Sequence, residues 1–471
     1  MISLSKFSKF INNNKIPIFL FFLALLSGFF WNHRFYFQAI PSGGDQRQYS
    51  CLAIDMIENG TYTECGTESF LEPGYPLFLA SIFLFSDTSP IAVRFVQLFI
   101  FGVIVVLIYF LSRRLFDSKV AFIAGLFTAL HWSLANYTGS LIREVFLVFS
   151  ILLLVYSLYI AVSSKKNTHF IISGLLFGVV ALSNAIIEYF LLFIIINFII
   201  ILRKKIEIKQ IFLKIGLFLF AFCLILSPWI VRNSLYYNKL VVSLTPKKGH
   251  ILSMRAALME EMYPNIHKYY FGHLFGYYFA EKVYPDLDIW AFRDFNAANS
   301  VMLELREEGY NLNQIDEIIS ERAVNKIITQ PHKYVAFCIL DFLNFNSPLI
   351  PQKIFMGNSY VHYTFAEGRF PTVPGYVKSG VLILFRIYWY TFLFLVIYGL
   401  CKNIKNWEKI SWFFLIILYF NGVYSAVHAL PRYAVQIYPF YIILASAGVL
   451  ILFKKYKHKI KSLVGKLSKT K

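Results

Sequence analysis

Residues 141–162 read LIREVFLVFSILLLVYSLYIAV, and this stretch decides the class of fold. After its Arg-Glu pair it has no charged residue, so as a helix it can cross a hydrocarbon core about 30 Å thick. Similar runs recur along the chain, which is 58% hydrophobic and only 15% charged. A soluble domain has about 45–50% apolar residues. The sequence therefore predicts an all-α, polytopic membrane protein.

Ten apolar runs can be interpreted as membrane spans, and we expect about 10–12 transmembrane helices in all. The ten runs are residues 16–34, 90–112, 119–134, 141–162, 169–183, 186–202, 211–230, 377–400, 410–430 and 433–453. The first run resembles a signal peptide, but no small-residue cleavage site follows it. We therefore interpret it as a retained first span.

Lysine and arginine are concentrated in alternate loops, and this bias predicts the orientation. With the N-terminus inside, every inner loop is basic and the short outer loops are nearly free of Lys and Arg, as the positive-inside rule requires. Both termini are then cytoplasmic, and the basic tail at 454–471 faces anionic membrane lipids. This distribution accounts for the net charge of +19 without nucleic acid as a partner.

The same orientation places two regions outside the membrane. The first outer loop, residues 35–89, contains a segment at 73–86 that is too short to span and is expected to form a juxtamembrane surface helix. The second region is expected to form a small, mainly helical outer cap. Its apolar stretch at 334–345 is interpreted as an interfacial or re-entrant helix, or as one of an unrecognised pair of spans. The predicted organisation is a catalytic membrane module at 1–230, the cap at 231–376, membrane helices at 377–453 and the cytoplasmic tail at 454–471.

The first outer loop carries an unusual carboxylate in the sequence SGGDQRQYS, residues 42–50. Asp45 and Tyr49 are four positions apart, so on a helix they share one face. Our hypothesis is that Asp45 is a catalytic base at the membrane surface. The alternative is that Asp45 caps a helix that begins at Gln46, and the two roles are compatible.

Cysteine and histidine show no metal-ligand spacing anywhere in the chain. Cys51 and Cys65 both fall in the first outer loop. They form a disulfide if that loop faces an oxidising compartment, and otherwise remain free.

Charged residues at the outer ends of spans are the second candidate group. Arg143 and Glu144 are adjacent and point about 100° apart on a helix, so we expect each to have its own partner. They either line a site or form an interhelical ion pair. Arg232 and Arg432 also lie at outer span ends, where they could bind a phosphate in a bidentate manner. For Arg232 the alternative is a side chain that snorkels to the interface.

At these residues the chain resembles the type-C glycosyltransferases of the protein mannosyltransferase and aminoarabinose transferase kind. The likeness rests on Gly44-Asp45-x-x-x-Tyr49 and on Pro73-Gly74-Tyr75-Pro76, and it continues through segments 143–144, 174–183, 227–233 and 432–439. It implies a polyprenyl-phosphate-linked sugar as donor, Asp45 as the catalytic carboxylate and Glu144 as a second acidic residue of the site. The residues expected to bind substrate are Tyr49, Glu72, Tyr75, Arg143, Arg232, Arg432 and Tyr433.

Glu72 departs from the family pattern, because relatives often carry a basic residue or proline before Pro-Gly. This departure leaves the contacts to the donor phosphate open. It also leaves a divalent metal open, with Glu72 as its candidate ligand, and no other cofactor is expected.

The chemistry of these residues agrees with the resemblance. A carboxylate at the outer surface can take the proton of an acceptor, and arginines can neutralise the leaving phosphate. The expected function is sugar transfer at the outer face of the cell membrane, to a lipid, a glycan or a protein. The alternatives are a lipid-linked glycan polymerase or ligase, and a transporter or flippase. A transporter should show internal repeats and midplane polar residues, of which the sequence shows little.

Overall fold

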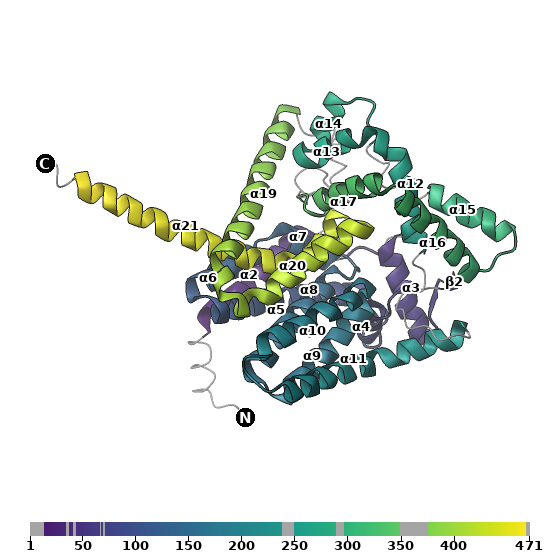
Figure 1. Ribbon diagram of the computed structural model, residues 1–471, viewed down its shortest axis with the longest axis horizontal. Helices are drawn as coiled ribbons and strands as arrows, with labels where there is room; N and C mark the ends of the chain where they lie inside the picture. Colours follow the sequence, from purple (N-terminus) through teal and green to yellow (C-terminus); the bar gives the residue numbers. More distant parts are fainter. Residues whose placement is uncertain are drawn as a thin grey trace.

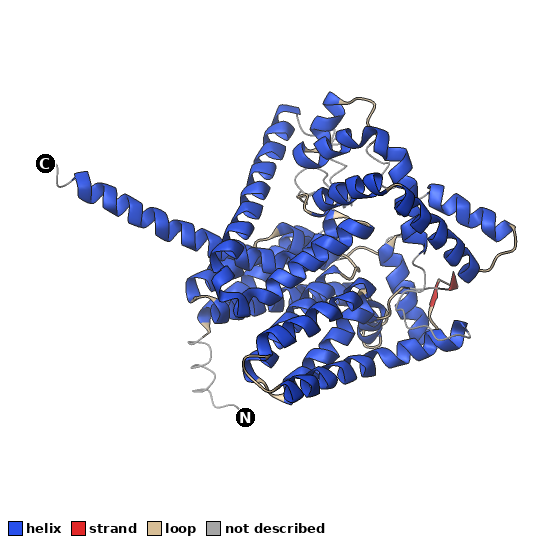
Figure 2. Cartoon of the chain, viewed as in Figure 1, coloured by secondary structure: helices blue, strands red, loops and turns tan. Residues whose placement is uncertain are grey.

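The computed structural model describes residues 14–33, 37–40, 44–65, 67–68, 71–237, 249–288, 296–348 and 375–467. Figures 1 and 2 show that this part of the chain is almost entirely helical. Its strands are a two-residue antiparallel pair, β1 (Thr63–Glu64) and β2 (Thr67–Glu68). The predicted all-α class is confirmed. Within the expected cap and tail, residues 238–248, 289–295, 349–374 and 468–471 lie outside the described residues.

All ten predicted spans coincide with helices. These helices are α2 (Lys15–Asn32), α5 (Pro90–Leu115), α6 (Ser118–Ala129) with α7 (Trp132–Asn136), α8 (Glu144–Ser164), α9 (Asn167–Ser183), α10 (Phe190–Leu202), α11 (Ile208–Tyr237), α19 (Gly375–Asn403), α20 (Trp407–Val427) and α21 (Tyr438–Leu467).

By length and composition, seven helices among the described residues can cross a membrane, or eight if the pair α6 and α7, bent by 46°, forms one span. The predicted 10–12 spans exceed this count for two reasons. Helix α9 has only 17 residues, and α19 and α20 follow each other within one 49-residue stretch, Ser379–Val427.

Local signals in the sequence explain where several helices begin. Pro90 occupies the first position of α5, where its missing N–H leaves no hydrogen bond unmade. Asp117 caps α6, because its carboxylate accepts from the backbone N–H groups of Lys119 and Val120, both at 2.9 Å. Glu144 lies in the first turn of α8, where a negative charge is favoured by the helix dipole.

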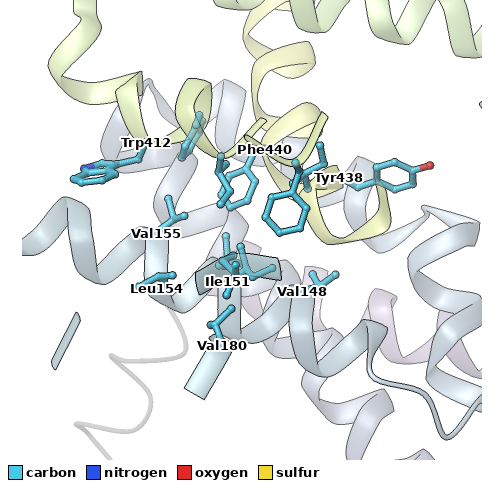
Figure 3. Close-up of a cluster of buried hydrophobic side chains, with 14 of the residues drawn as sticks. Val148, Ile151, Leu154, Val155, Val180, Trp412, Tyr438 and Phe440 are labelled. Atoms are coloured by element: carbon cyan, nitrogen blue, oxygen red, sulfur yellow. The ribbon is translucent and has the colours of Figure 1, made fainter. Parts of the chain in front are cut away.

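Helix α8 lies at the centre of the membrane region. Figure 3 shows apolar side chains of α8 between those of α9 on one side and those of α20 and α21 on the other. The labelled residues are Val148, Ile151, Leu154 and Val155 of α8, Val180 of α9, Trp412 of α20, and Tyr438 and Phe440 of α21. The 3₁₀ helix η7 (Pro431–Ile437), which leads into α21, also packs against α8. The N-terminal and C-terminal parts of the chain therefore meet at this helix.

The segment predicted as the first outer loop contains α3 (Asp45–Glu58), the β1–β2 hairpin and α4 (Gly74–Phe83). A disulfide between Cys51 and Cys65 joins α3 to the hairpin, so the first of the two alternatives for these cysteines is the one observed. Helix α4 lies within the expected segment 73–86 and packs against α3, α5 and α9. Its position along a membrane surface remains a prediction.

Asp55 holds the turn that follows α3, and this contact should make the loop sensitive to acid. Its carboxylate accepts from Asn59 Nδ2 at 2.9 Å, Thr61 Oγ1 at 2.7 Å and the Thr63 N–H at 2.7 Å. Burial acts to raise the pKa of Asp55, but these hydrogen bonds outweigh it and lower the pKa. A group whose pKa falls on folding stabilises the fold above its unfolded pKa, about 4, and loses this effect as pH falls through the folded pKa.

We therefore expect Asp55→Asn to lower the thermal midpoint of the purified protein at pH 7, and the difference from wild type to shrink below about pH 4. The matched control is Glu58→Gln, an exposed carboxylate at the end of the same helix. A difference in midpoint that stays constant down to pH 3 would contradict this role for the Asp55 charge.

The cap consists of α12 (Gly249–Met262), α13 (Ile266–Phe275), α14 (Tyr277–Val283), α15 (Asn296–Glu307), α16 (Leu312–Thr329) and α17 (Pro331–Phe345). Figure 1 shows these helices gathered on one side of the molecule. Helix α17 contains the apolar stretch predicted at 334–345 and packs on α20, which joins the cap to the membrane helices. Its interfacial position remains a prediction.

Candidate active site

Three charged side chains from distant parts of the chain meet where three helices begin. Asp45 is the first residue of α3, Glu144 is the first residue of α8, and Arg432 lies in η7. Arg432 Nη1 lies 2.7 Å from Asp45 Oδ2, and Arg432 Nε lies 3.8 Å from Glu144 Oε1. We call Asp45, Glu144 and Arg432 the carboxylate–arginine group.

Asp45 is not the N-cap of its helix, so that alternative is wrong. The cap position belongs to Gly44, and no side chain caps the helix. Gly44 has φ +72°, a left-handed conformation that glycine adopts without the cost of a Cβ. This conformation starts the helix one residue earlier than predicted, and the Asp45 carboxylate faces Arg432 instead of a backbone N–H.

The two carboxylates of the group differ in exposure. The Asp45 side chain is 39% exposed, whereas the Glu144 side chain is 5% exposed. Buried Glu144 Oε2 has no hydrogen-bond partner among the described residues. Asp45 is therefore the carboxylate of the group that is accessible from outside the protein, whereas Glu144 is buried.

A second ion pair lies beside the group. Arg143 Nη1 is 3.1 Å from Glu72 Oε2 and also donates to the Ser183 carbonyl at 3.1 Å. The other carboxylate oxygen of Glu72 accepts from the Ala185 N–H at 2.9 Å. Arg143 and Glu144 thus have separate partners, as their angular separation predicts. Both oxygens of Glu72 are engaged within the protein.

Gly74 explains how this second pair is assembled. A Cβ at position 74 would lie 2.2 Å from Ser183 Oγ and 2.8 Å from the Leu182 backbone. Only glycine allows the start of α4 to approach the end of α9 so closely. The Pro-Gly-Tyr-Pro motif therefore brings Glu72 to Arg143 and Ala185.

Removal of one partner of the Arg143–Glu72 pair should destabilise the protein. We expect Glu72→Leu to cost about 3–5 kcal/mol, because it leaves a largely buried arginine without its carboxylate. The double variant Glu72→Leu/Arg143→Met should regain most of this stability, since apolar residues can replace a buried pair. Thermal unfolding in detergent would measure both effects.

Sugar transfer by the double variant separates the two hypotheses for Arg143. If Arg143 builds the site, the double variant is stable and inactive. If Arg143 only joins helices, the double variant regains activity along with stability.

The two predicted tyrosines pack together under the group. The ring of Tyr49 meets that of Tyr75 edge to face, with centroids 5.0 Å apart. Burial raises the pKa of Tyr49 above its usual range. The positive charge of Arg143 acts to lower this pKa, whereas the negative charges of Glu72, Asp45 and Glu144 raise it further. The buried Tyr49 hydroxyl therefore feels the electrostatic field of all four charged side chains. Tyr75 donates to Gln97 Oε1 at 3.0 Å, which assigns its hydroxyl to a contact inside the protein.

Tyr433 and its neighbours connect the group to α9 and α20. The ring of Tyr433 stacks on Tyr424 at 4.9 Å, and the Arg432 guanidinium lies 5.3 Å from the Tyr433 ring. Asn184 Nδ2 donates to Tyr424 Oη at 3.0 Å and to Gln436 Oε1 at 3.1 Å. These contacts hold η7 against the end of α9.

Arg232 approaches the site through aromatic residues. Its guanidinium lies 4.9 Å from the ring of Trp229 and 5.4 Å from the ring of Tyr62. Tyr62 Oη donates to the Leu71 carbonyl at 2.9 Å, and Leu71 precedes Glu72. Arg232 therefore lies on the Glu72 side of the site and supports the first outer loop.

Three polar residues that position the site were not predicted. Gln46 Oε1 accepts from the Leu141 N–H at 3.0 Å, which joins α3 to the segment before α8. Arg94 Nε donates to the Gly139 carbonyl at 3.0 Å, and Gln97 Nε2 donates to the Ser140 carbonyl at 2.7 Å. Polar residues three positions apart inside an apolar span are the signal that could have identified Arg94 and Gln97.

The described residues contain no cluster of three or more His, Cys, Asp or Glu side chains that could hold a metal ion. Glu72, the candidate ligand from the sequence, is the carboxylate bound by Arg143 and Ala185.

Comparison with protein families gives a match that covers this site in part. Residues 72–231 match the family described as dolichyl-phosphate-mannose-protein mannosyltransferase. The matched segment begins at Glu72 and includes Arg143 and Glu144. Over these residues the chain is similar to type-C membrane glycosyltransferases. This match confirms the resemblance inferred from the sequence. A comparison of the chain with curated proteins finds no match.

Solved structures show what the fold of this chain is similar to. The apo oligosaccharyltransferase from Archaeoglobus fulgidus superposes with a TM-score of 0.52 at 12% identity, over 96% of this chain and 52% of that chain. Archaeal oligosaccharyltransferase AglB of the same organism, in complex with an inhibitory peptide and a dolichol-phosphate, gives 0.50 at 12% identity, over 95% and 51%. ArnT from Cupriavidus metallidurans bound to undecaprenyl phosphate gives 0.40 at 12% identity, over 92% and 77%. The chain spans about half the length of the archaeal enzymes, and the similarity to them is one of fold.

Proposed function

We propose that this protein is a glycosyltransferase that moves a sugar from a polyprenyl-phosphate donor to an acceptor at the outer face of the cell membrane, with Asp45 as general base. The observation that carries the proposal is the 2.7 Å contact between the exposed Asp45 carboxylate and Arg432, with Glu144 buried beside them. This arrangement offers a proton acceptor and a phosphate-binding cation at one place.

The reaction needs both groups. The acceptor oxygen attacks the anomeric carbon of the sugar, and its proton passes to Asp45. The bond between that carbon and the phosphate oxygen breaks, and polyprenyl phosphate leaves with the bonding electrons. Arg432 is placed to neutralise the phosphate because a guanidinium binds phosphate oxygens in a bidentate manner.

The contact between Asp45 and Arg432 implies an order of events. Before substrate arrives, the Arg432 guanidinium is paired with the Asp45 carboxylate. A donor phosphate that reaches Arg432 competes with Asp45 for the guanidinium. Asp45 then becomes available to the acceptor only when the donor is in place, which limits unproductive reaction with water.

Two observations support a polyprenyl-phosphate donor. The family that matches residues 72–231 is described by a dolichyl-phosphate sugar, and a structure of similar fold holds a dolichol-phosphate. A sugar on such a lipid presents its reacting carbon at the membrane surface. The acceptor class remains a lipid, a glycan or a protein side chain.

The proposed orientation predicts which loops an impermeant reagent can reach. A cysteine placed at exposed Asn59, after α3, should react with an impermeant maleimide from outside intact cells. A cysteine placed at exposed Glu207, between α10 and α11, should react only after permeabilisation. The reverse pattern would overturn the orientation, and with it an active site on the outer face.

The function itself can be tested by following the lipid product. Purified protein incubated with cellular polyprenyl-phosphate sugars should release free polyprenyl phosphate, measured by mass spectrometry. Cells that lack the protein should accumulate one lipid-linked sugar and lose that sugar from an envelope component. Unchanged lipid-linked sugars in such cells, together with no release by the purified protein, would reject the proposal.

A further inference from the structure

The turn that carries Arg432 is held from the other side by the cap. Arg255 of α12 donates through Nη2 to the Ser425 carbonyl at 2.9 Å, and Tyr334 Oη of α17 donates to the Ala426 carbonyl at 2.9 Å. Asn344 Nδ2, also of α17, donates to the Ala429 carbonyl at 2.7 Å. Two carbonyls in the last turn of α20 and one in the connection to η7 therefore accept a hydrogen bond from a cap side chain.

A buried ion pair holds Arg255, the first of these donors, in place. Arg255 Nη1 pairs with Asp341 Oδ2, and the two side chains are 2% and 0% exposed. The Arg255 guanidinium also lies 5.4 Å from the ring of Tyr334. Because Asp341 fixes one arm of the guanidinium, the other arm is directed at the Ser425 carbonyl.

The connection from these contacts to Arg432 is short and stiff. Ala429 is followed by Leu430 and then by Pro431, whose ring fixes one backbone torsion at the start of η7. The Tyr433 N–H closes the turn on the Leu430 carbonyl at 2.9 Å. A shift of the Ala426–Ala429 backbone is therefore passed to the residue that contacts Asp45.

We propose that Arg255, Asp341 and Tyr334 are positioning residues for the reaction, because they set where Arg432 is held relative to Asp45 and Glu144. The consequence for catalysis rests on the proposed function, whereas the structural coupling does not. The cap then acts on the site through the α20–η7 turn and needs no contact with substrate to do so.

A matched pair of substitutions tests this proposal. Tyr334→Phe removes one cap hydroxyl that donates to the turn, and Tyr277→Phe removes one cap hydroxyl that contacts His273 instead. Hydrogen exchange of the full-length protein should become faster over residues 425–433 in Tyr334→Phe and stay unchanged there in Tyr277→Phe. This measurement needs no sugar transfer, so it separates failure of this inference from failure of the proposed function.

Kinetics provide the second readout. Tyr334→Phe should lower kcat about 3- to 10-fold, the usual effect of one hydrogen bond, while KM for the donor changes little. Arg255→Lys should lower kcat further, since lysine cannot bind Asp341 and the Ser425 carbonyl with a planar fork. In the Arg432→Lys background, each cap variant should lower kcat much less than it does in the wild-type protein. The effects of residues that act through one group are not additive.

Three results would overturn the proposal. They are unchanged exchange over 425–433 in Tyr334→Phe, equal effects of Tyr334→Phe and Tyr277→Phe on kcat, and full additivity with Arg432→Lys. Each of these results would mean that the Arg255–Asp341 pair stabilises the cap and does not position Arg432.

Discussion

Asp45→Asn should lower the rate of sugar transfer by about 10²–10⁴-fold, the usual contribution of a positioned proton acceptor. Asparagine keeps the size of the side chain and can still accept a hydrogen bond from Arg432, but it cannot take a proton from the acceptor. Because Gly44 rather than Asp45 is the cap residue of α3, the helix should remain intact. Turnover with the purified lipid donor is the measurement.

The matched control is Asp87→Asn, which removes an exposed carboxylate from the same outer loop. It should transfer sugar at the wild-type rate. Donor binding and thermal stability should be nearly unchanged in both variants. Near-normal turnover by Asp45→Asn would reject Asp45 as the base and leave Glu144 as the next candidate, since both Glu72 oxygens are engaged.

Arg432→Gln should lower turnover by about 10²–10³-fold, the effect seen when one group that stabilises developing charge is removed. Glutamine preserves much of the side-chain length but leaves Asp45 and Glu144 without their shared cation. Arg432→Lys should recover only part of the loss, because a single ammonium cannot face two carboxylates as a guanidinium does.

Chemical rescue is the most direct check on Arg432. In Arg432→Ala, free guanidinium added to the assay should restore part of the turnover, whereas an equal concentration of sodium should not. Rescue is a readout that a purely structural role for Arg432 would not give. An Arg432→Gln variant with normal turnover would place the phosphate-binding cation elsewhere, with Arg143 as the alternative.

The membrane fold could be predicted because its signal is local. An apolar run of about 20 residues determines a helix whatever its neighbours are, and each predicted run coincides with a helix. The separate partners of Arg143 and Glu144 could also be predicted, because the geometry of one helix sets their directions.

The partners themselves could not be predicted, because they come from segments far apart in the chain. Nothing near Asp45 in the sequence indicates that Arg432 lies 2.7 Å away. The same holds for Gln46, whose side chain accepts from the Leu141 N–H, because side-chain contacts with distant backbone leave no periodic pattern. The N-cap prediction for Asp45 failed for a local reason, since the left-handed Gly44 begins the helix one residue early.

The meeting of Asp45 and Arg432 also has a consequence for biosynthesis. Asp45 is synthesised long before Arg432, which lies in η7 just before α21. Domains assemble as the chain emerges, so the early helices can pack while the carboxylate still lacks its cation. The carboxylate–arginine group therefore cannot form until η7 has been synthesised, and a chain that stalls before η7 lacks the cation of the proposed site.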